Sequence, residues 1–234
     1  MRKSFGIIAF ALAASAQAAP VERALVYKVG DAEMTSTLVY DDAGPAKRPG
    51  IVMVPNWMGV TPSAIERAKR IAGDDYVVLV ADVYGTGVRP ADTKAASEQV
   101  GKMFADVPVL RARAVEALAQ LEAQAGSAPL DVEDLGAIGY CFGGATALEL
   151  ARTGADIDAV VSFHGSLKTP IPAKQGEVKA SLLVLNGADD GNVTPEAIAA
   201  FEQEMKAANA DWQFVNFSGA VHCFAEDDAK RPPG

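Results

Sequence analysis

Short apolar segments alternate with stretches of helical spacing along most of this chain, and this alternation is the feature that most restricts its fold. The apolar segments show no polar alternation, which is typical of strands buried on both faces of a sheet. They comprise residues 50–55, 76–82, 135–140, 159–163 and 182–186. Apolar residues recur every three or four positions, as in helices packed on one side, at residues 63–72, 91–104, 107–123, 143–152 and 195–208.

Alternating strands and helices predict an α/β fold with a mostly parallel central sheet and helices on both of its faces. Residues 22–29 and 34–40 flank a Gly30-Asp31 turn signal, and their Val, Tyr and Thr content predicts an opening antiparallel pair. The chain has 234 residues, half of them hydrophobic, which is enough for one sizeable core. We therefore expect a single domain over residues 19–234.

Charge and the count of metal-binding residues exclude several classes of function. The formal net charge is −9, and no basic patch offers a surface for nucleic acid. The two Cys and two His lie at positions 141, 164, 222 and 223, without the spacing of a zinc motif. We expect no structural metal and no cofactor.

The first 18 residues resemble a secretory signal peptide. A cationic Arg2-Lys3 pair precedes an apolar run, residues 5–14, that is too short to span a bilayer, and Ala16-Gln17-Ala18 forms a small-residue cleavage site. The mature protein is expected to be periplasmic or secreted and to have no membrane contact after cleavage. N-terminal sequencing of the exported protein should find Ala19 first, and an intact Met1 would contradict this expectation.

The sequence Gly139-Tyr140-Cys141-Phe142-Gly143-Gly144 lies where a predicted strand meets a predicted helix. A nucleophile elbow requires this context, here with Cys in place of the usual Ser. The glycines permit a sharp turn whose neighbouring backbones come close together. The helix N-terminus favours a thiolate at Cys141, and the Phe142 amide is placed to bind an oxyanion.

A nucleophilic thiol needs a base, and the base needs an acid that orients it. Asp190 follows the strand at residues 182–186, and His222 follows the last predicted strand, residues 211–217. Nucleophile, acid and histidine thus occur in the chain order of the α/β-hydrolase triad. Asp189 competes with Asp190 for the acidic role, and either His222 or Asp190 taken alone could be an ordinary surface-loop residue.

Three motifs resemble the dienelactone hydrolase family of α/β hydrolases: GYCFGG, the GxxDxxV spacing from Gly187 to Val193, and AVHCF at the end. The resemblance covers residues 50–224, with PNWMGV at residues 55–60 in the oxyanion-loop position and ADVYG at residues 81–85 at a strand end. It implies a triad of Cys141, Asp190 and His222. It also implies an oxyanion hole built from the backbone N–H groups of Trp57 and Phe142.

The chain departs from the family pattern at positions that concern the substrate. Asn56 occupies the place of a glutamate that helps to activate the thiol, while Thr86 and Glu226 occupy the places of two arginines that clamp a substrate carboxylate. Without that clamp, a negatively charged lactone should bind poorly. We expect a small neutral ester, lactone or phosphotriester as substrate, in a pocket formed by Trp57, Asn56, Met58, Tyr84 and Phe224, with His164 either lining the pocket or buried as a structural residue.

Cys223 allows an alternative of another class. A disulfide between Cys141 and Cys223 would make the protein a non-catalytic binding domain in an oxidising compartment. The triad order argues against it, and neighbouring loop residues tend to point apart, so Cys223 is expected to pack behind His222 as a small apolar residue. Met103 and Phe104 are expected in the core.

Only twelve residues follow His222, whereas the family fold closes with one more helix. This resemblance predicts that the helix is missing and that an apolar patch is exposed in its place. The sequence does not decide the oligomeric state. The expected activity is hydrolysis of neutral carboxylic esters or lactones through a covalent Cys acyl-enzyme, with neutral phosphotriesters as the alternative substrates.

Overall fold

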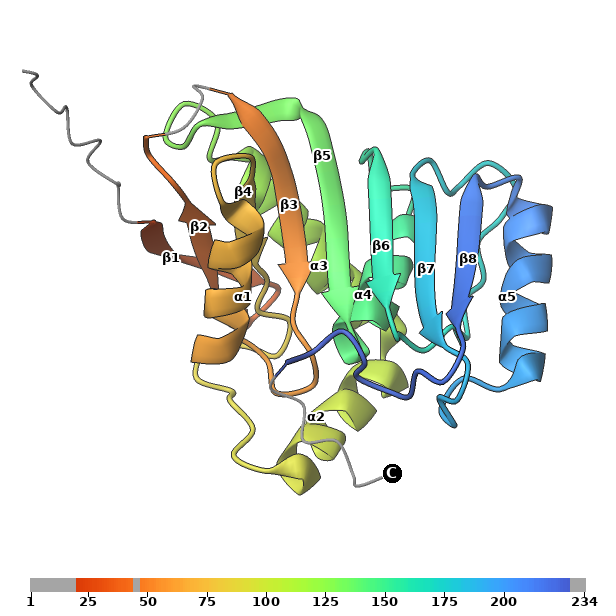
Figure 1. Cartoon of the computed structure of the whole chain (residues 1–234). Coiled ribbons are helices and arrows are strands. Elements are labelled where there is room, and N and C mark those ends of the chain that lie inside the picture. The colour runs from red at the N-terminus through yellow and green to blue at the C-terminus, as the bar shows by residue number, and fades with distance from the viewer. Residues whose placement is uncertain (1–19, 44–46, 228–234) are drawn as a thin grey trace, which may run out of the picture.

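A computed structural model describes residues 20–43 and 47–227, and the predicted signal peptide lies outside these residues. One eight-stranded sheet runs through the molecule in the order β1-β2-β4-β3-β5-β6-β7-β8 (Figure 1). The pairs β1–β2 and β2–β4 are antiparallel, and the other pairs are parallel. The strands are β1 (Val21–Val29), β2 (Ala32–Tyr40), β3 (Arg48–Val54), β4 (Val77–Val80), β5 (Leu130–Tyr140), β6 (Ala159–Phe163), β7 (Ser181–Gly187) and β8 (Trp212–Phe217).

Helices cover both faces of the sheet, as predicted. The helix α1 packs against β2 and β4 on one face, where its alanines join Val78 and Val80 in a small apolar cluster. On the other face, α3 and α4 pack against β3, β5 and β6, and α5 contributes Phe201 to the larger core. The helices are α1 (Pro62–Ala72), α2 (Thr93–Ala105), α3 (Val107–Glu122), α4 (Phe142–Arg152) and α5 (Pro195–Ala208).

The helix α4 is buried along its whole length and is held by charged side chains as well as apolar ones. Glu149 accepts hydrogen bonds from Arg111 of α3 at 2.7 Å and from Arg152 at 3.1 Å. Arg152 also donates to Glu204 of α5 at 2.8 Å and to the carbonyl of Leu167. Because every charge in this network has a partner, the energetic cost of burying these charged groups is offset. The network also fixes α4 relative to α3 and α5.

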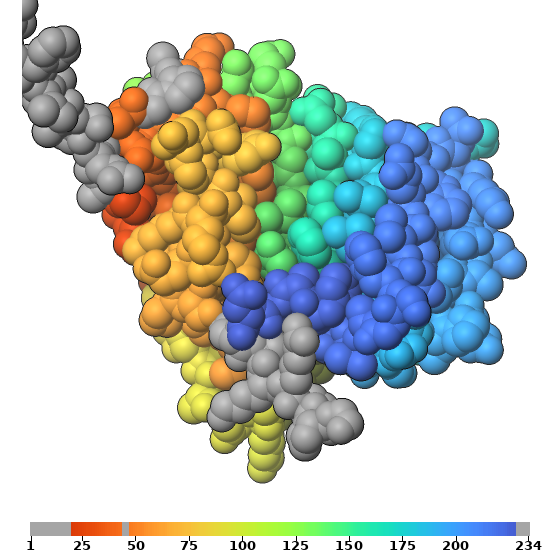
Figure 2. Space-filling model, viewed as in Figure 1, coloured from red at the N-terminus to blue at the C-terminus, as the bar shows by residue number. Residues whose placement is uncertain are grey.

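The α1 face of the sheet is unevenly covered. No helix of the described residues lies over β6, β7 and β8 on this face, and Figure 2 shows these strands at the surface of the molecule. Alternate apolar residues there, Val161, Phe163, Leu183 and Leu185, are partly exposed. This part of the α1 face is therefore apolar and partly exposed.

The sequence pattern predicted the elements well. Each expected strand and helix occurs, with boundaries shifted by one or two residues in most cases. The largest difference is β5, which begins at Leu130 instead of Leu135, because its first residues pair with Arg48 and Pro49 before a register shift. Within the described residues, no helix is long and apolar enough to cross a membrane.

Candidate active site

A tight turn joins β5 to α4 and places Cys141 at the helix N-terminus. Cys141 has φ 54°, a left-handed conformation that is unusual for a residue with a side chain. A Cβ atom on Gly139 would lie 2.0 Å from the carbonyl oxygen of Gly143, and a Cβ on Gly143 would lie 2.0 Å from that of Val54. Only glycine fits at these two positions, which accounts for the GxCxG pattern.

His222 and Asp190 complete a line of hydrogen-bonded side chains. The Nε2 atom of His222 lies 3.1 Å from the Sγ atom of Cys141, and its Nδ1 atom lies 2.7 Å from Oδ2 of Asp190. The carboxyl ends of parallel strands meet at one edge of the sheet, so three segments distant in sequence bring these residues together. The predicted triad residues are therefore in contact, in the predicted order.

The structure distinguishes between the two neighbouring acids. Asp190 is buried, and its Oδ1 atom accepts hydrogen bonds from the backbone N–H of Asn192 at 2.9 Å and from its side-chain amide at 3.0 Å. Asp189 is exposed, and its backbone N–H donates to the carbonyl of Ala220. The Asp190 carboxylate, fixed by Asn192, is the one that orients His222.

Cys223 is not the inert packing residue that we expected. Its backbone has φ 61°, and this left-handed turn directs the side chain into the pocket beside His222 instead of behind it. The Cys223 thiol hydrogen-bonds to Cys141, and this contact, together with the Phe142 N–H, lowers the pKa of Cys141 despite burial. The same contact and burial raise the pKa of Cys223, so Cys223 stays a thiol and donates to the Cys141 thiolate.

The pKa of His222, the histidine next to the Cys141 thiol, is raised. Hydrogen bonds to Cys223 and to Asp190 raise the pKa of His222 to about 9, against the opposing effect of burial. A positively charged imidazolium next to a thiol of lowered pKa stabilises the thiolate form of that thiol. The arrangement therefore favours a thiolate at Cys141, and it keeps a proton on His222 at neutral pH.

His164 has both of the roles that the sequence left open. It is 1% exposed, has φ 42°, and accepts a hydrogen bond from the Cys141 backbone N–H at its Nδ1 atom, 3.1 Å away. Burial lowers the pKa of His164 to about 4, so the ring is neutral at physiological pH. It also lines the pocket, edge-on to His222.

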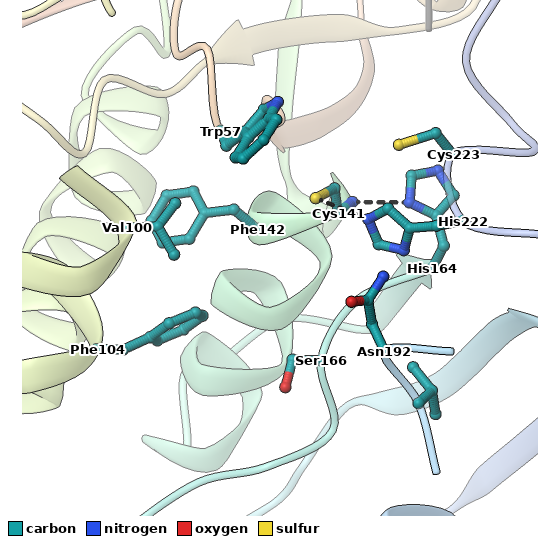
Figure 3. Close-up of a pocket in the computed structure, with 11 residues that line it drawn as sticks. Trp57, Val100, Phe104, Cys141, Phe142, His164, Ser166, Asn192, His222 and Cys223 are labelled. Carbon is teal, nitrogen blue, oxygen red and sulfur yellow. Dashed lines mark hydrogen bonds between the residues drawn. The ribbon is translucent and has the colours of Figure 1, made fainter. Parts of the chain in front are cut away.

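A cavity of about 330 Å³ opens at Cys141. Figure 3 shows aromatic and aliphatic side chains on one side of the Cys141 thiol and His222, Cys223 and His164 on the other. The lining residues of this cavity include no Lys, Arg, Asp or Glu. They are Trp57, Val100, Phe104, Cys141, Phe142, His164, Ser166, Asn192, Val193, His222 and Cys223.

Four predicted pocket residues are not among those that line this cavity. The Tyr84 ring stacks on Phe142 with centroids 5.3 Å apart, and its hydroxyl donates to the Trp57 carbonyl, so it supports the pocket wall from behind. Phe224 packs edge-on against His164. Asn56 accepts a hydrogen bond from the Met58 N–H, and both residues belong to the turn that carries Trp57.

Sequence reasoning missed five lining residues: Val100, Phe104, Ser166, Asn192 and Val193. Phe104, which we expected in the core, is 37% exposed because α2 ends beside the pocket and presents it there together with Val100, one turn earlier. The spacing of these two residues was a visible signal, but it does not distinguish a core face from a pocket wall. Asn192 lies within the GxxDxxV motif and could have been expected to fix Asp190.

The positions that depart from the family pattern have other partners. Glu226 is buried, and its carboxylate accepts hydrogen bonds from Asn56 at 2.9 Å and from Arg67 at 3.1 Å. The Thr86 hydroxyl lies 2.8 Å from that of Thr35. Neither side chain offers a positive charge to a substrate.

The alternative of a disulfide-bonded binding domain disagrees with the structure. Both cysteines are free thiols. They lie side by side in the pocket, but as hydrogen-bonded neighbours and not as a covalent bridge.

The mostly parallel sheet, the elbow between β5 and α4, and the Cys-His-Asp contact together define an α/β hydrolase. The family model for the dienelactone hydrolase family matches residues 35–232. The chain belongs to this family, as its motifs predicted.

Solved structures and curated proteins agree with this assignment. The structure called m3DLH is 37% identical, has a TM-score of 0.83, and is matched over 90% of this chain and 86% of that one. The dienelactone hydrolase-like promiscuous phosphotriesterase P91, from metagenomic libraries, is 34% identical with a TM-score of 0.79, over 88% of this chain and 84% of that one. Protein K02A2.1 of Caenorhabditis elegans is 39% identical over 103 residues, which are 43% of this chain and 65% of that protein.

Replacing Cys223 by Ala should raise the pKa of Cys141, because the substitution removes the thiol that donates to the Cys141 thiolate. Alkylation of Cys141 by iodoacetamide requires the thiolate, so its pH dependence should move to higher pH in Cys223→Ala. Peptide mass mapping of the alkylated residue measures this directly. Ser166→Ala, in the same pocket, should leave the profile in place, and an unchanged profile in Cys223→Ala would contradict the assigned role.

Proposed function

We propose that this protein hydrolyses small neutral carboxylic esters and lactones through a covalent acyl-enzyme on Cys141. One observation carries the proposal: the hydrogen-bonded line from Cys141 through His222 to Asp190 ends in a cavity beside a helix N-terminus. Membership of the dienelactone hydrolase family makes the protein an esterase or lactonase in broad terms. We propose in addition that Cys141 is the nucleophile, that the substrate is neutral, and that His222 and Asp190 act with Cys141 as the triad.

In the first step the Cys141 thiolate attacks the carbonyl carbon of the bound ester. The developing oxyanion is bound by the Phe142 N–H, which already points at the sulfur, and by the Trp57 N–H. In the turn that follows Asn56, the amides of Met58 and Gly59 are occupied by Asn56 acceptors, so the Trp57 amide is the one assigned to the oxyanion. The tetrahedral intermediate then expels the alcohol, which takes the proton from Nε2 of His222.

In the second step, neutral His222 accepts a proton from water, and the resulting hydroxide attacks the Cys141 thioester. The acid product leaves, and the thiolate–imidazolium pair is restored. Asp190 keeps the His222 ring in place and stabilises the imidazolium through the 2.7 Å contact. No cofactor is needed for either step.

The preference for neutral substrates rests on the pocket wall. None of the residues that line the cavity is a Lys or Arg, and Thr86 and Glu226 cannot pair with a carboxylate. Trp57, Phe104 and Phe142 offer apolar surface for an acyl or aryl group. A negatively charged substrate would lose its hydration in this cavity without a compensating charge.

Neutral phosphotriesters are a second candidate substrate class. A structural relative that is 34% identical is described as a promiscuous phosphotriesterase. A thiolate and an oxyanion hole can serve attack at phosphorus as well as at carbon, and a neutral triester needs no cationic clamp.

We further propose that the enzyme acts after export. This rests on residues 1–18, whose cationic, apolar and small-residue segments have the order of a signal peptide. The mature chain would then begin at Ala19.

Substitutions in the triad should affect turnover of a neutral p-nitrophenyl ester unequally. Cys141→Ala should lower kcat/KM by a factor of roughly 10⁴ or more, and His222→Ala nearly as much, because the two residues act as one unit. Asp190→Asn should lower kcat/KM less, since Asp190 orients His222 and stabilises its charged form but does not itself react with the substrate. Substantial activity in Cys141→Ala would refute the proposed nucleophile.

Substrate charge is the second test. A neutral short-chain aryl ester should have a higher kcat/KM than an anionic dienelactone of similar size, because the pocket has no cation for the carboxylate. Steady-state kinetics with both substrates, and with a neutral phosphotriester, measure the preference. A higher kcat/KM for the anionic lactone would overturn the interpretation of the pocket.

A further inference from the structure

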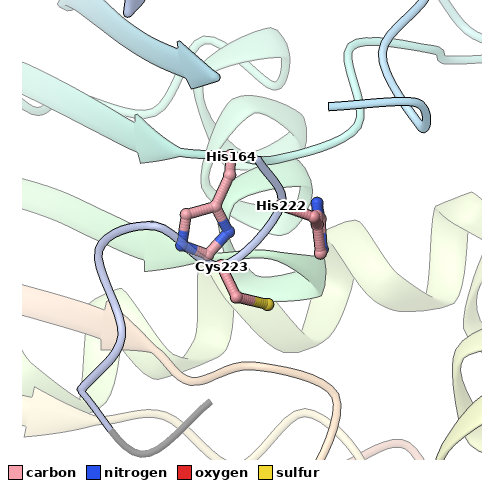
Figure 4. A group of neighbouring side chains, drawn as sticks. All are labelled: His164, His222 and Cys223. Atoms are coloured by element: carbon pink, nitrogen blue, oxygen red, sulfur yellow. The ribbon is translucent and has the colours of Figure 1, made fainter. Parts of the chain in front are cut away.

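All the cysteines and histidines of this chain meet at one place. The sequence contains two of each, and Cys141, His164, His222 and Cys223 all line the same cavity. One ring nitrogen of His164, one of His222 and the Cys223 Sγ atom lie within 4.8 Å of one another (Figure 4). The Cys141 Sγ atom lies 3.1 Å from Nε2 of His222, at the edge of this group.

The dimensions of the cluster are close to those of a four-ligand metal site. Tetrahedral zinc with bonds of about 2.0 Å to nitrogen and 2.3 Å to sulfur holds its ligand atoms about 3.3 to 3.8 Å apart. The 4.8 Å limit that encloses the His164, His222 and Cys223 atoms exceeds these separations by about 1 Å, a difference that small side-chain rotations can close. Two thiolates and two imidazoles are the ligand set that tetrahedral zinc prefers.

The surroundings of the two histidines also resemble those of metal ligands. A histidine that binds a metal commonly donates its other N–H to a carboxylate, and Nδ1 of His222 is held in this way by Asp190. His164 is 1% exposed, and its Nε2 atom has no hydrogen-bond partner among the described residues. The Cys141 backbone N–H donates a hydrogen bond to His164 and a second one to the Phe163 carbonyl at 3.0 Å. It therefore keeps a hydrogen-bond partner if the His164 ring turns.

We propose that Cys141, His164, His222 and Cys223 form a binding site for Zn²⁺ or a similar soft divalent cation, and that the bound metal blocks the catalytic site. Binding releases the protons of the Cys223 thiol and of His222 Nε2 into the buffer. The Nδ1 atom of His164 accepts a hydrogen bond, so the neutral ring carries its proton on Nε2, and this proton moves to Nδ1 when Nε2 binds the metal. Two metal–sulfur and two metal–nitrogen bonds form. No oxidation or reduction is involved.

The four protein ligands leave no open position on the metal, as in structural zinc sites and unlike catalytic ones. The metal therefore does not activate water. It holds the Cys141 sulfur and the His222 Nε2 atom that hydrolysis requires. The loss of activity rests on the proposed function, whereas metal binding by these four residues does not.

Cobalt absorption tests metal binding without reference to activity. The mature protein, kept reduced with a phosphine under nitrogen so that no disulfide forms, is titrated with Co²⁺. The expected result is the visible spectrum of tetrahedral cobalt, with sulfur-to-cobalt charge-transfer absorption of two thiolates, at one equivalent. Zn²⁺ should displace Co²⁺ and remove this spectrum, and it should abolish ester hydrolysis at the same stoichiometry. A chelator added afterwards should restore the hydrolytic activity.

The ligand set is tested by matched variants. Cys223→Ala should reduce the charge-transfer absorption to that of one thiolate. It should also weaken metal binding by more than about tenfold, since the loss of a residue that only hydrogen-bonds to a metal ligand already lowers metal affinity that much. His164→Gln, with its fold checked by circular dichroism, should also weaken binding, while Ser166→Ala in the same pocket should bind as the wild type does. Absence of a tetrahedral cobalt spectrum, or unchanged metal affinity in Cys223→Ala, would overturn the proposed site. Metal binding without loss of hydrolysis would instead contradict the proposed function of Cys141 and His222.

Discussion

The backbone turn at Cys141 is the constraint on which the site depends. To place the thiol at the start of α4, the chain adopts a left-handed conformation at a residue with a side chain, which costs about 1 to 3 kcal/mol. Gly139 and Gly143 make the turn possible, because their backbones approach each other and Val54 where no Cβ atom fits. The turn persists because α4 is buried along its length and tied to α3 and α5 by the charged network around Glu149 and Arg152. The stable packing of α4 thus maintains the unfavourable backbone conformation at Cys141.

The charges around this turn act as one system. The helix N-terminus and the Phe142 N–H favour a thiolate, the Cys223 thiol donates to it, and His222 carries the balancing positive charge. Asp190, held by Asn192, balances His222 in turn. In a pocket with apolar walls these interactions are stronger than in water, and an uncompensated charge on a substrate is correspondingly costly. The same compact group of sulfur and nitrogen atoms that makes a nucleophile also makes a set of metal ligands.

Much of this could be predicted from the sequence, because the features concerned are local. Buried parallel strands have recognisable apolar runs, and a glycine-flanked Cys between a strand and a helix is typical of a nucleophile elbow. The chain order of Asp190 and His222 then placed both at the same sheet edge. Other features depend on details that spacing does not encode. The left-handed backbone at Cys223 reversed the expected direction of its side chain. Phe104 lines the pocket because of where α2 ends. His164 meets Cys141, His222 and Cys223 because these residues follow β6, β5 and β8 at one edge of the sheet, not because of any metal-binding spacing along the chain.

The central claim is that Cys141 forms a covalent bond to the acyl group of a neutral ester. Mass spectrometry of protein mixed with a p-nitrophenyl ester and quenched in acid within the first turnovers tests it most directly. One added acyl group is expected, located on Cys141 by peptide mapping, absent from Cys141→Ala and lost again when the reaction continues. Acylation of another residue, or undiminished ester turnover by Cys141→Ala, would contradict it.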